Sequence, residues 1–235
     1  MPFAIPKDNA YLTHLASTRG PKQLSKEWFR MRRFALTGST VATVLGLNKY
    51  ETKNQLIKKK LSTKKRPTPY ACSHGIRYER EAVCVYESIS NERVADVDFG
   101  FRIHHQYEFL GGSPDGITFS LKLLEIKCPL RRKIIKGFVP IHYMPQLQLL
   151  MEIFDLDSCD YFEYKPESIS NEMEYNLVNV KRKQNWLNEN LETFCSFHKR
   201  LLNEYVTFEE SDDEVTFVTK SSELDSLVIT NVLMN

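Results

Sequence analysis

The sequence predicts an α/β fold of the mixed α+β type, with one central mixed β-sheet flanked by helices. Helical patterns fill most of residues 24–90, strand-like runs rich in β-branched and aromatic residues follow over residues 93–129, and helix and strand alternate from residue 143 onward. The chain has 235 residues, of which 42% are hydrophobic and 26% charged, and this suits one folded core better than two. We therefore expect a single domain over residues 1–205 and a tail over residues 206–235.

Four helical segments are expected in the N-terminal part of the chain. The second of them can be capped by Thr37 or Ser39 and can end at Gly46. The third runs into the basic segment KKKLSTKKR at residues 58–66, which we interpret as a solvated loop closed by the prolines that follow, with a nuclear-import signal or a DNA contact as the alternatives. The four segments cover residues 24–36 (a helix or an extended lead-in), 37–46, 48–69 (helix and basic loop together) and 71–90.

The sheet is expected from strand-like segments in the second half of the chain. A helix over residues 143–156 interrupts them and carries Pro145 near its first turn, where a missing N–H group is tolerated. A long amphipathic helix over residues 181–205 ends the expected domain. The expected strands cover residues 93–112, 116–120, 122–129, 158–166 and 174–180.

Charge is distributed unevenly along the chain. Residues 1–70 hold 15 Lys or Arg against 3 Asp or Glu, residues 71–200 hold 16 against 19, and residues 201–235 hold 1 against 8. A basic start and an acidic end predict a polyanionic partner and a tail that repels it, whereas the alternative is a solvated surface with chance segregation. The tail, which contains EESDDE, is expected to be flexible.

Several classes of protein are disfavoured by the sequence. No apolar run approaches the roughly 18 residues that a membrane span needs, and the N-terminus lacks the basic start and apolar block of a secretory signal. The five cysteines lie far apart and form no CxxC pair, which disfavours a disulfide framework or a zinc site. We therefore expect an intracellular protein, cytoplasmic or nuclear, in a reducing compartment and without membrane association.

Charged side chains interrupt the strand expected at residues 122–129. Glu125 and Lys127 are two positions apart, so they share one face of the strand while Ile126 points to the other. A hairpin that turns near residues 120–122 would bring Asp115 opposite them. Two carboxylates beside a lysine, with the backbone carbonyl of Ile126, suit a hard cation with oxygen ligands. The alternative is an exposed hairpin with a Lys–Glu surface pair.

A third carboxylate strengthens the first interpretation. On the helix expected at 71–90, Glu79 lies three, four and seven positions before Ala82, Val83 and Tyr86, which places it on the apolar, inward face. Three carboxylates and a lysine suit one or two Mg²⁺ ions that hold a phosphodiester and activate a water molecule.

These residues carry a resemblance to a known family. Asp115, nine intervening residues, and then Glu125-Ile126-Lys127 resembles the restriction-endonuclease-like core of the PD-(D/E)XK nuclease superfamily. The order of WFRMRRFALTGS, HGIRYERE, GGSPDG, LEIKCP and YMPQLQ is similar to the phage lambda-type alkaline exonucleases, the YqaJ-like viral recombinase group. The resemblance implies that Asp115, Glu125 and Glu79 bind the metal and that Lys127 positions or deprotonates the attacking water.

The resemblance also implies supporting and DNA-binding residues. Gln146 would support the lysine and the metal-bound water, with Gln148 as the alternative. Arg32, or its neighbour Arg33, would contact the end phosphate of DNA together with Ser39, whose position at the start of a short helix also favours an anion. Gly38 departs from the alanine common in the family. The residues expected to contact the DNA backbone just after the catalytic strand are Arg131 and Arg132, followed by Lys133 and Lys136.

The function implied is a 5′→3′ exonuclease that acts on double-stranded DNA ends with Mg²⁺, for which Mn²⁺ can substitute, and leaves 3′ single strands for recombination or viral genome processing. The implied partners are DNA ends, a single-strand annealing protein and two further copies in a homotrimer, in a host cell of a virus or phage. An endonuclease or nickase, or an RNA-cleaving relative, with the same site is the alternative. A catalytically silent nucleic-acid-binding module is a third hypothesis, which the intact Asp115, Glu125 and Lys127 disfavour.

Overall fold

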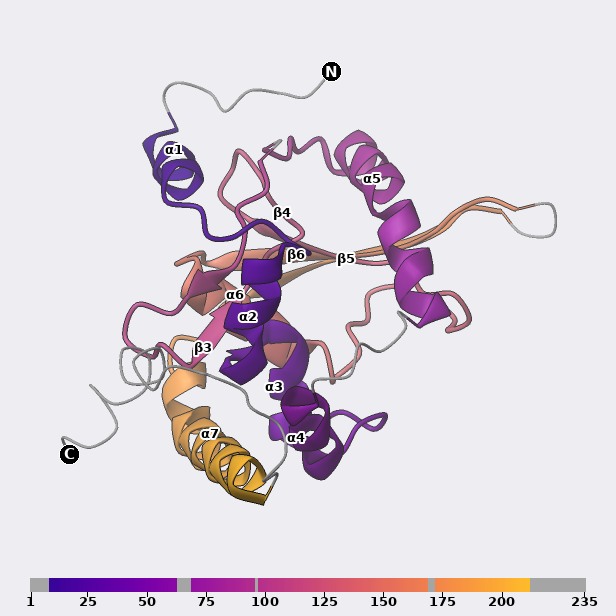
Figure 1. Cartoon of the computed structure of the whole chain (residues 1–235). Coiled ribbons are helices and arrows are strands. Elements are labelled where there is room, and N and C mark those ends of the chain that lie inside the picture. The colour runs from indigo at the N-terminus through magenta and orange to yellow at the C-terminus, as the bar shows by residue number, and fades with distance from the viewer. Residues whose placement is uncertain (1–8, 63–68, 96, 169–171, 212–235) are drawn as a thin grey trace.

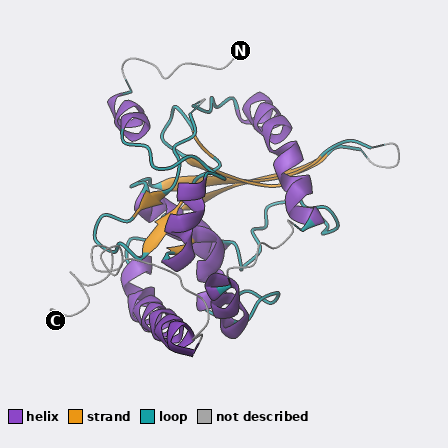
Figure 2. Cartoon of the chain, viewed as in Figure 1, coloured by secondary structure: helices purple, strands orange, loops and turns teal. Residues whose placement is uncertain are grey.

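The computed structural model describes residues 9–62, 69–95, 97–168 and 172–211 (Figures 1 and 2). Its helices are α1 (Ala10–Ser17), α2 (Lys26–Phe34), α3 (Gly38–Val44), α4 (Lys53–Leu61), α5 (Tyr70–Ser90), α6 (Met144–Ile153) and α7 (Trp186–Ser211). Its strands are β1 (Leu36–Thr37), β2 (Arg102–Ile103), β3 (Leu110–Gly112), β4 (Gly116–Ile117), β5 (Leu123–Lys127), β6 (Ser158–Lys165) and β7 (Glu174–Lys181).

The strands form two mixed sheets rather than the single sheet expected. In the larger sheet, of order β4-β5-β6-β7, β5 and β6 are parallel and the other neighbours are antiparallel. The smaller sheet has the order β1-β3-β2, with β1 parallel and β2 antiparallel to β3. The predicted fold class, mixed α/β with helices around mixed sheets, is confirmed.

The long strand expected over residues 93–112 is wrong for most of its length. Apart from β2, β3 and an antiparallel bridge between Val94 and Thr118, the described part of this run is irregular. Phe99 and Phe101 are buried in it, and their backbone pairs with an N-terminal loop: the Gly20 N–H donates to the Phe99 carbonyl at 3.3 Å, and the Phe101 N–H to the Pro21 carbonyl at 3.0 Å. The aromatic side chains of this run therefore belong to a buried loop and not to a strand.

Helices cover the two faces of the larger sheet. On β5, Leu124 and Ile126 pack with Ala82 and Tyr86 of α5, whereas Leu123 belongs to the larger core built with α3, α6 and α7. Figure 1 shows α5 against β5, and α2, α3, α4 and α7 grouped together away from it. Because side chains alternate along a strand, the face of β5 that carries Glu125 and Lys127 is turned toward α6.

The helix ends follow local capping signals. The region expected as a helix or an extended lead-in is helical, since the Ser25 hydroxyl accepts the Trp28 N–H at 3.2 Å and caps α2. The sequence analysis missed α1, which Asn9 caps by accepting the Leu12 N–H at 3.0 Å. At the other end, α7 continues past the expected boundary at residue 205, and residues 212–235 of the expected tail lie outside the described residues. None of the described helices is both long and apolar enough to cross a bilayer.

Candidate active site

The hairpin of β4 and β5 brings Asp115 beside the charged pair on β5. Gly116 pairs with Leu124, so the next residue pair outward is Asp115 and Glu125. The turn closes through the Thr118 hydroxyl, which accepts the Lys122 N–H at 3.0 Å, and Leu121 adopts the left-handed conformation with φ +62°. The carboxylate Oδ2 of Asp115 accepts the Ile126 N–H at 2.7 Å.

Glu125 is the most enclosed member of the site, with only 1% of its surface exposed. Its Oε1 accepts hydrogen bonds from Lys127 Nζ and, at 2.5 Å, from Gln146 Nε2. Its Oε2 is buried, and it has no hydrogen-bond partner among the described residues. A buried carboxylate oxygen without a donor is unfavourable unless a cation is bound beside it.

Burial and neighbouring charges shift the pKa values of the charged residues in the site. Burial and the neighbouring Asp115 charge raise the pKa of Glu125, and burial raises the pKa of Asp115. Burial lowers the pKa of Lys127, but the carboxylates of Glu125 and Asp115 raise it by more, so the ammonium stays charged. The raised carboxylate pKa values come mainly from burial, so a bound divalent cation would stabilise the charged carboxylates here.

Glu79 reaches the same region from α5. It is half-buried, and burial together with the Asp115 charge raises its pKa. Glu79 and Asp115 line a cavity of about 520 Å³ and also a second cavity of about 740 Å³, so they lie between the two. Across the described part of the chain, no three His, Cys, Asp or Glu side chains are grouped closely enough to hold a metal ion. The donor set that fits a cation is therefore Asp115 and the free Oε2 of Glu125, with Ile126 and Glu79 beside the same cavity.

The two glutamines of α6 have different surroundings. Gln146 lines the smaller cavity and donates to Glu125, as the sequence analysis expects. Gln148 is buried on the other side, where it donates to the Lys181 carbonyl at 3.0 Å and accepts the Lys183 N–H at 2.8 Å. Gln148 therefore ties α6 to the end of β7, and Gln146 is the one that contacts the candidate catalytic residues.

Arg32 contacts the smaller cavity through Ser39, which lines it. An Arg32 guanidinium nitrogen donates to the Ser39 hydroxyl at 3.0 Å, and the guanidinium carbon lies 4.1 Å from the centre of the Trp28 ring. Trp28 is fixed in turn by its indole N–H, which donates to Ser113 at 3.1 Å. Burial lowers the pKa of Arg32 to about 10, which leaves it charged at neutral pH. Thr37 is the residue that caps α3, so Ser39 lies in its first turn with an exposed hydroxyl.

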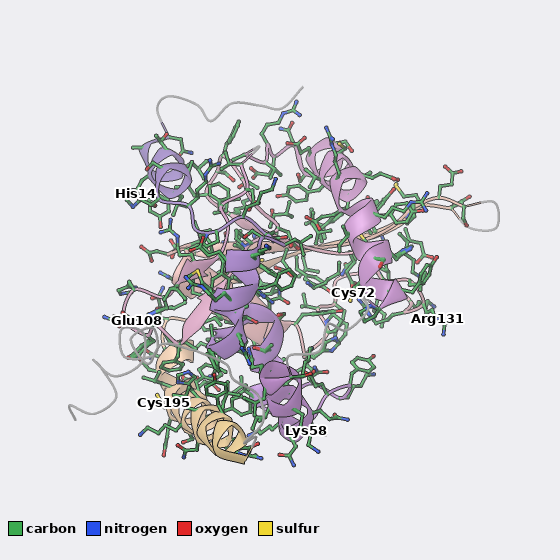
Figure 3. All side chains as sticks on the ribbon, in the orientation of Figure 1. His14, Lys58, Cys72, Glu108, Arg131 and Cys195 are labelled. Carbon is green, nitrogen blue, oxygen red and sulfur yellow. The ribbon has the colours of Figure 1, made fainter. Side chains whose placement is uncertain are left out.

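The other predicted phosphate contacts are placed differently. The Arg33 guanidinium lies 5.3 Å from the Phe34 ring centre and 5.6 Å from that of Tyr205, and Arg33 does not line the smaller cavity. Arg131 is exposed at the surface (Figure 3). Arg132 forms an ion pair with Glu163, which is buried and also accepts from the Tyr161 hydroxyl at 2.7 Å.

Lys60 has a structural role that was not predicted from the sequence. Its ammonium donates to the backbone carbonyls of Arg32 at 3.0 Å, Arg33 at 3.4 Å and Ala35 at 2.7 Å, at the C-terminal end of α2. The interpretation of residues 58–66 as a solvated loop is therefore wrong for Lys60, and residues 63–68 of that run lie outside the described residues. The available signal was helical spacing, because Lys60 lies three and four positions after the buried Ile57 and Leu56.

Comparison with known proteins identifies the family. The sequence pattern of the YqaJ-like viral recombinase domain matches residues 27–157. An uncharacterized protein of Acanthamoeba polyphaga mimivirus is 28% identical over 165 residues, which are 61% of this chain and 29% of that protein. A protein of African swine fever virus is 32% identical over 160 residues, which are 54% of this chain and 45% of that protein. The chain thus spans less than half of the length of these viral relatives.

Solved structures agree with this match. An alkaline exonuclease from Laribacter hongkongensis superposes with a TM-score of 0.64 at 25% identity, over 79% of this chain and 97% of that one. A phage-related exonuclease from Haemophilus somnus has the same fold, with a TM-score of 0.54 at 13% identity, over 74% of this chain and 96% of that one. The family and these neighbours indicate a nuclease of the alkaline exonuclease type. Since the match extends over more than half of its length, the chain belongs to the YqaJ-like viral recombinase domain family.

Proposed function

We propose that this protein is a Mg²⁺-dependent exonuclease that degrades duplex DNA from its ends in the 5′→3′ direction, with Mn²⁺ as a substitute metal. The observation that carries the proposal is one cavity lined by Asp115, Lys127 and Gln146 and also by Ser39, the hydrogen-bond partner of Arg32. Hydrolysis requires carboxylates and a proton-handling group, whereas recognition of an end requires a cation for the terminal phosphate. The first requirement is met inside the cavity, and the second by Arg32, which is hydrogen-bonded to Ser39 of the cavity wall.

The metal ion would be held by the carboxylates of Asp115 and Glu125 with the Ile126 carbonyl, and the Glu79 carboxylate, which lines the same cavity, would have to move closer to join them. When bound, the ion supplies charge stabilisation to the scissile phosphate and lowers the pKa of a water molecule. Lys127, whose ammonium contacts Glu125, would orient the attacking water in its charged form, and it would first have to lose a proton to act as the base. Gln146 would keep the Glu125 carboxylate in place through its hydrogen bond.

Relatives support the substrate class. The Laribacter hongkongensis enzyme is an alkaline exonuclease, and its structure has also been determined with dAMP. A nucleoside monophosphate is the kind of product that stepwise removal of nucleotides releases. By extension from these relatives, the products would be 3′ single strands that an annealing protein uses in recombination or viral genome processing. The active form would be a homotrimer of a virus-encoded enzyme, in the cytoplasm or nucleus of the host cell.

The test compares linear with closed circular duplex DNA, each incubated with Mg²⁺, Ca²⁺ or EDTA. We expect mononucleotides to be released only from linear DNA and only with Mg²⁺, and a 5′-end label to be released before a 3′-end label. Ca²⁺ should support binding without turnover, since it is larger and less demanding in geometry. Cutting of the closed circle would favour the endonuclease alternative instead, and equal digestion of an RNA duplex would contradict the DNA substrate.

Substitutions test the residue assignment. Asp115→Ala, Glu125→Ala and Lys127→Ala should each abolish cleavage while duplex binding survives, because affinity comes mainly from phosphate contacts elsewhere. Glu108→Ala is the matched control, since Glu108 is an exposed carboxylate away from both cavities (Figure 3). Substantial cleavage by Asp115→Ala would refute the active-site assignment.

A further inference from the structure

Aromatic rings form a row that begins at the candidate catalytic lysine. Lys127 Nζ lies 5.2 Å from the centre of the Tyr143 ring, and the His142 ring lies 4.2 Å from the Tyr143 ring between centres. The Tyr50 ring follows at 5.9 Å from His142, with an angle of 86° between the two planes. All three aromatic residues line the smaller cavity. The row therefore connects the hydrolytic residues to a loop on the protein surface.

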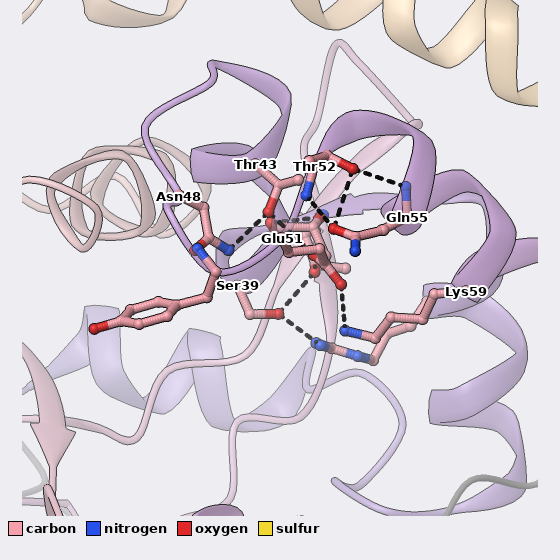
Figure 4. Close-up of polar contacts among 11 residues, drawn as sticks. Ser39, Thr43, Asn48, Glu51, Thr52, Gln55 and Lys59 are labelled. Atoms are coloured by element: carbon pink, nitrogen blue, oxygen red, sulfur yellow. Dashed lines mark hydrogen bonds and ion pairs between the residues drawn. The ribbon is translucent and has the colours of Figure 1, made fainter. Parts of the chain in front are cut away.

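Tyr50 is exposed although its loop is well ordered by hydrogen bonds. The Asn48 side chain accepts the Tyr50 N–H at 3.0 Å and donates to Thr43 at 2.9 Å, and Thr43 donates to Glu51 at 3.1 Å (Figure 4). Lys59 of α4 then donates to Glu51 at 3.0 Å. The backbone that carries Tyr50 is thus fixed to α3 and α4 on both sides of the residue.

The Tyr50 ring itself has no structural role that packing explains. Its exposed fraction is 68%, it belongs to neither hydrophobic core, and its hydroxyl has no hydrogen-bond partner among the described residues. Cations lie along the row, because Lys49 Nζ is 5.1 Å from the Tyr50 ring centre and Lys127 is at the other end. Burial, with the neighbouring cations Arg132 and Lys49, lowers the pKa of His142, so this ring is neutral at neutral pH.

We propose that Tyr50 and His142 form a stacking site for the nucleobase of the terminal nucleotide while the scissile phosphate on the 3′ side of that nucleotide lies near Lys127. This proposal rests on the exonuclease function proposed above. Tyr50 is exposed and has Lys49 beside its ring, so a base can stack on it, and that base would then meet the perpendicular His142 ring edge-to-face. Stacking tolerates every base, because each has a π-face, which suits an enzyme that removes nucleotides without regard to sequence. The cavity of about 520 Å³ is within the range of small-ligand sites.

Abasic ends provide the kinetic test. Rates are measured on two linear duplexes with 5′-phosphates, one of them with an abasic terminal nucleotide, for the wild type and for Tyr50→Ala and Tyr50→Phe. The wild type should lose about tenfold in kcat/KM on the abasic end, and Tyr50→Ala should lose about as much on the normal end and little more on the abasic end. Tyr50→Phe should behave as the wild type because stacking needs the ring and not the hydroxyl. Tyr70→Ala is the control, since Tyr70 is 75% exposed and does not line the cavity.

Equilibrium binding separates a failure of the base site from a failure of the enzyme assignment. With Ca²⁺ present, wild-type protein should bind dAMP about tenfold more tightly than deoxyribose 5-phosphate, and Tyr50→Ala should lose that difference. The stacking site alone is overturned if the wild type degrades normal and abasic ends at equal rates. It is also overturned if Tyr50→Ala keeps the tenfold preference for dAMP over deoxyribose 5-phosphate. Absence of any Mg²⁺-dependent degradation of linear DNA overturns the proposed function itself.

Discussion

Replacement of Arg32 tests whether the protein reads the 5′-phosphate of a DNA end. Its guanidinium is largely enclosed, with one nitrogen 3.0 Å from the Ser39 hydroxyl and its carbon 4.1 Å from the Trp28 ring centre. A guanidinium held in this way loses little side-chain freedom when it binds an anion, so most of the interaction energy contributes to binding. A charge-assisted contact contributes about 1.5–3 kcal/mol, which corresponds to a preference of roughly ten- to a hundredfold for 5′-phosphorylated over 5′-hydroxyl ends.

The assay measures initial rates on the two kinds of end for the wild type, Arg32→Ala and Arg32→Lys. Arg32→Ala should remove most of the preference while slow Mg²⁺-dependent cleavage persists, because the carboxylates of the site are untouched. Arg32→Lys should recover only part of the preference, since the lysine ammonium can neither bind the phosphate through two nitrogens nor stack on Trp28 as the planar guanidinium does. Arg33→Ala is the matched control, because the Arg33 side chain lies by Tyr205 instead.

Two outcomes would refute this reasoning. If the wild type cleaves both ends at equal rates, no residue reads the phosphate and the endonuclease alternative gains support. If Arg32→Ala slows cleavage equally on both ends, Arg32 acts on the structure or the chemistry and not on the terminal phosphate. Thermal unfolding of each variant shows whether the fold is retained.

Four further predictions follow from other contacts. Gln146→Ala should lower kcat about ten- to a hundredfold with DNA binding unchanged, because Gln146 holds Glu125; an unchanged kcat would contradict this. Lys60→Met should lower the free energy of unfolding by about 1–3 kcal/mol, as measured in urea, since three carbonyls lose their donor, and a variant as stable as Lys58→Met would argue against it. Burial and the neighbouring His105 lower the pKa of His104 to about 4. The folded protein should therefore lose stability as the pH falls from about 6.5 toward 4, because the unfolded chain then binds more protons. If His104→Asn shows the same dependence of stability on pH, His104 is not its cause. Removal of residues 212–235 should leave cleavage rates unchanged, because their acidic charge repels DNA, whereas a folded but inactive product would contradict this.

The core of the site was predictable from local patterns. Glu125 and Lys127 share a face because strand periodicity is two, and a hairpin that turns at residues 118–122 brings Asp115 to them. Gln146 could be assigned only through the family resemblance, because its contact with Glu125 joins residues on separate elements. The hairpin is a short-range structure, and short-range structure is what a single sequence specifies best.

The misplaced features depend on contacts between distant segments. The run at residues 93–112 has strand-like composition, but Phe99 and Phe101 are buried by pairing with residues near Gly20. Lys60 sits within a basic run, and only its packing against the end of α2 distinguishes it from its solvated neighbour Lys58 (Figure 3). The aromatic run gives no signal of its pairing with residues near Gly20, whereas helical spacing from Leu56 and Ile57 places Lys60 on the inward side of α4 without naming its partners.

The position of Glu79 and Asp115 between two cavities affects how ions and water would reach the site. The larger cavity, of about 740 Å³, meets the smaller one at Ile76, Glu79 and Asp115, and it also exposes the carboxylates of Glu87 and Asp98. A polyanion bound at the side near Ser39 would leave the acidic side open. The carboxylates on that side repel the polyanion and attract small cations. Under the proposed function, ions and water would reach Glu79 and Asp115 from the acidic side while DNA stays bound near Ser39. Metal and water could then be renewed between cuts without release of the DNA.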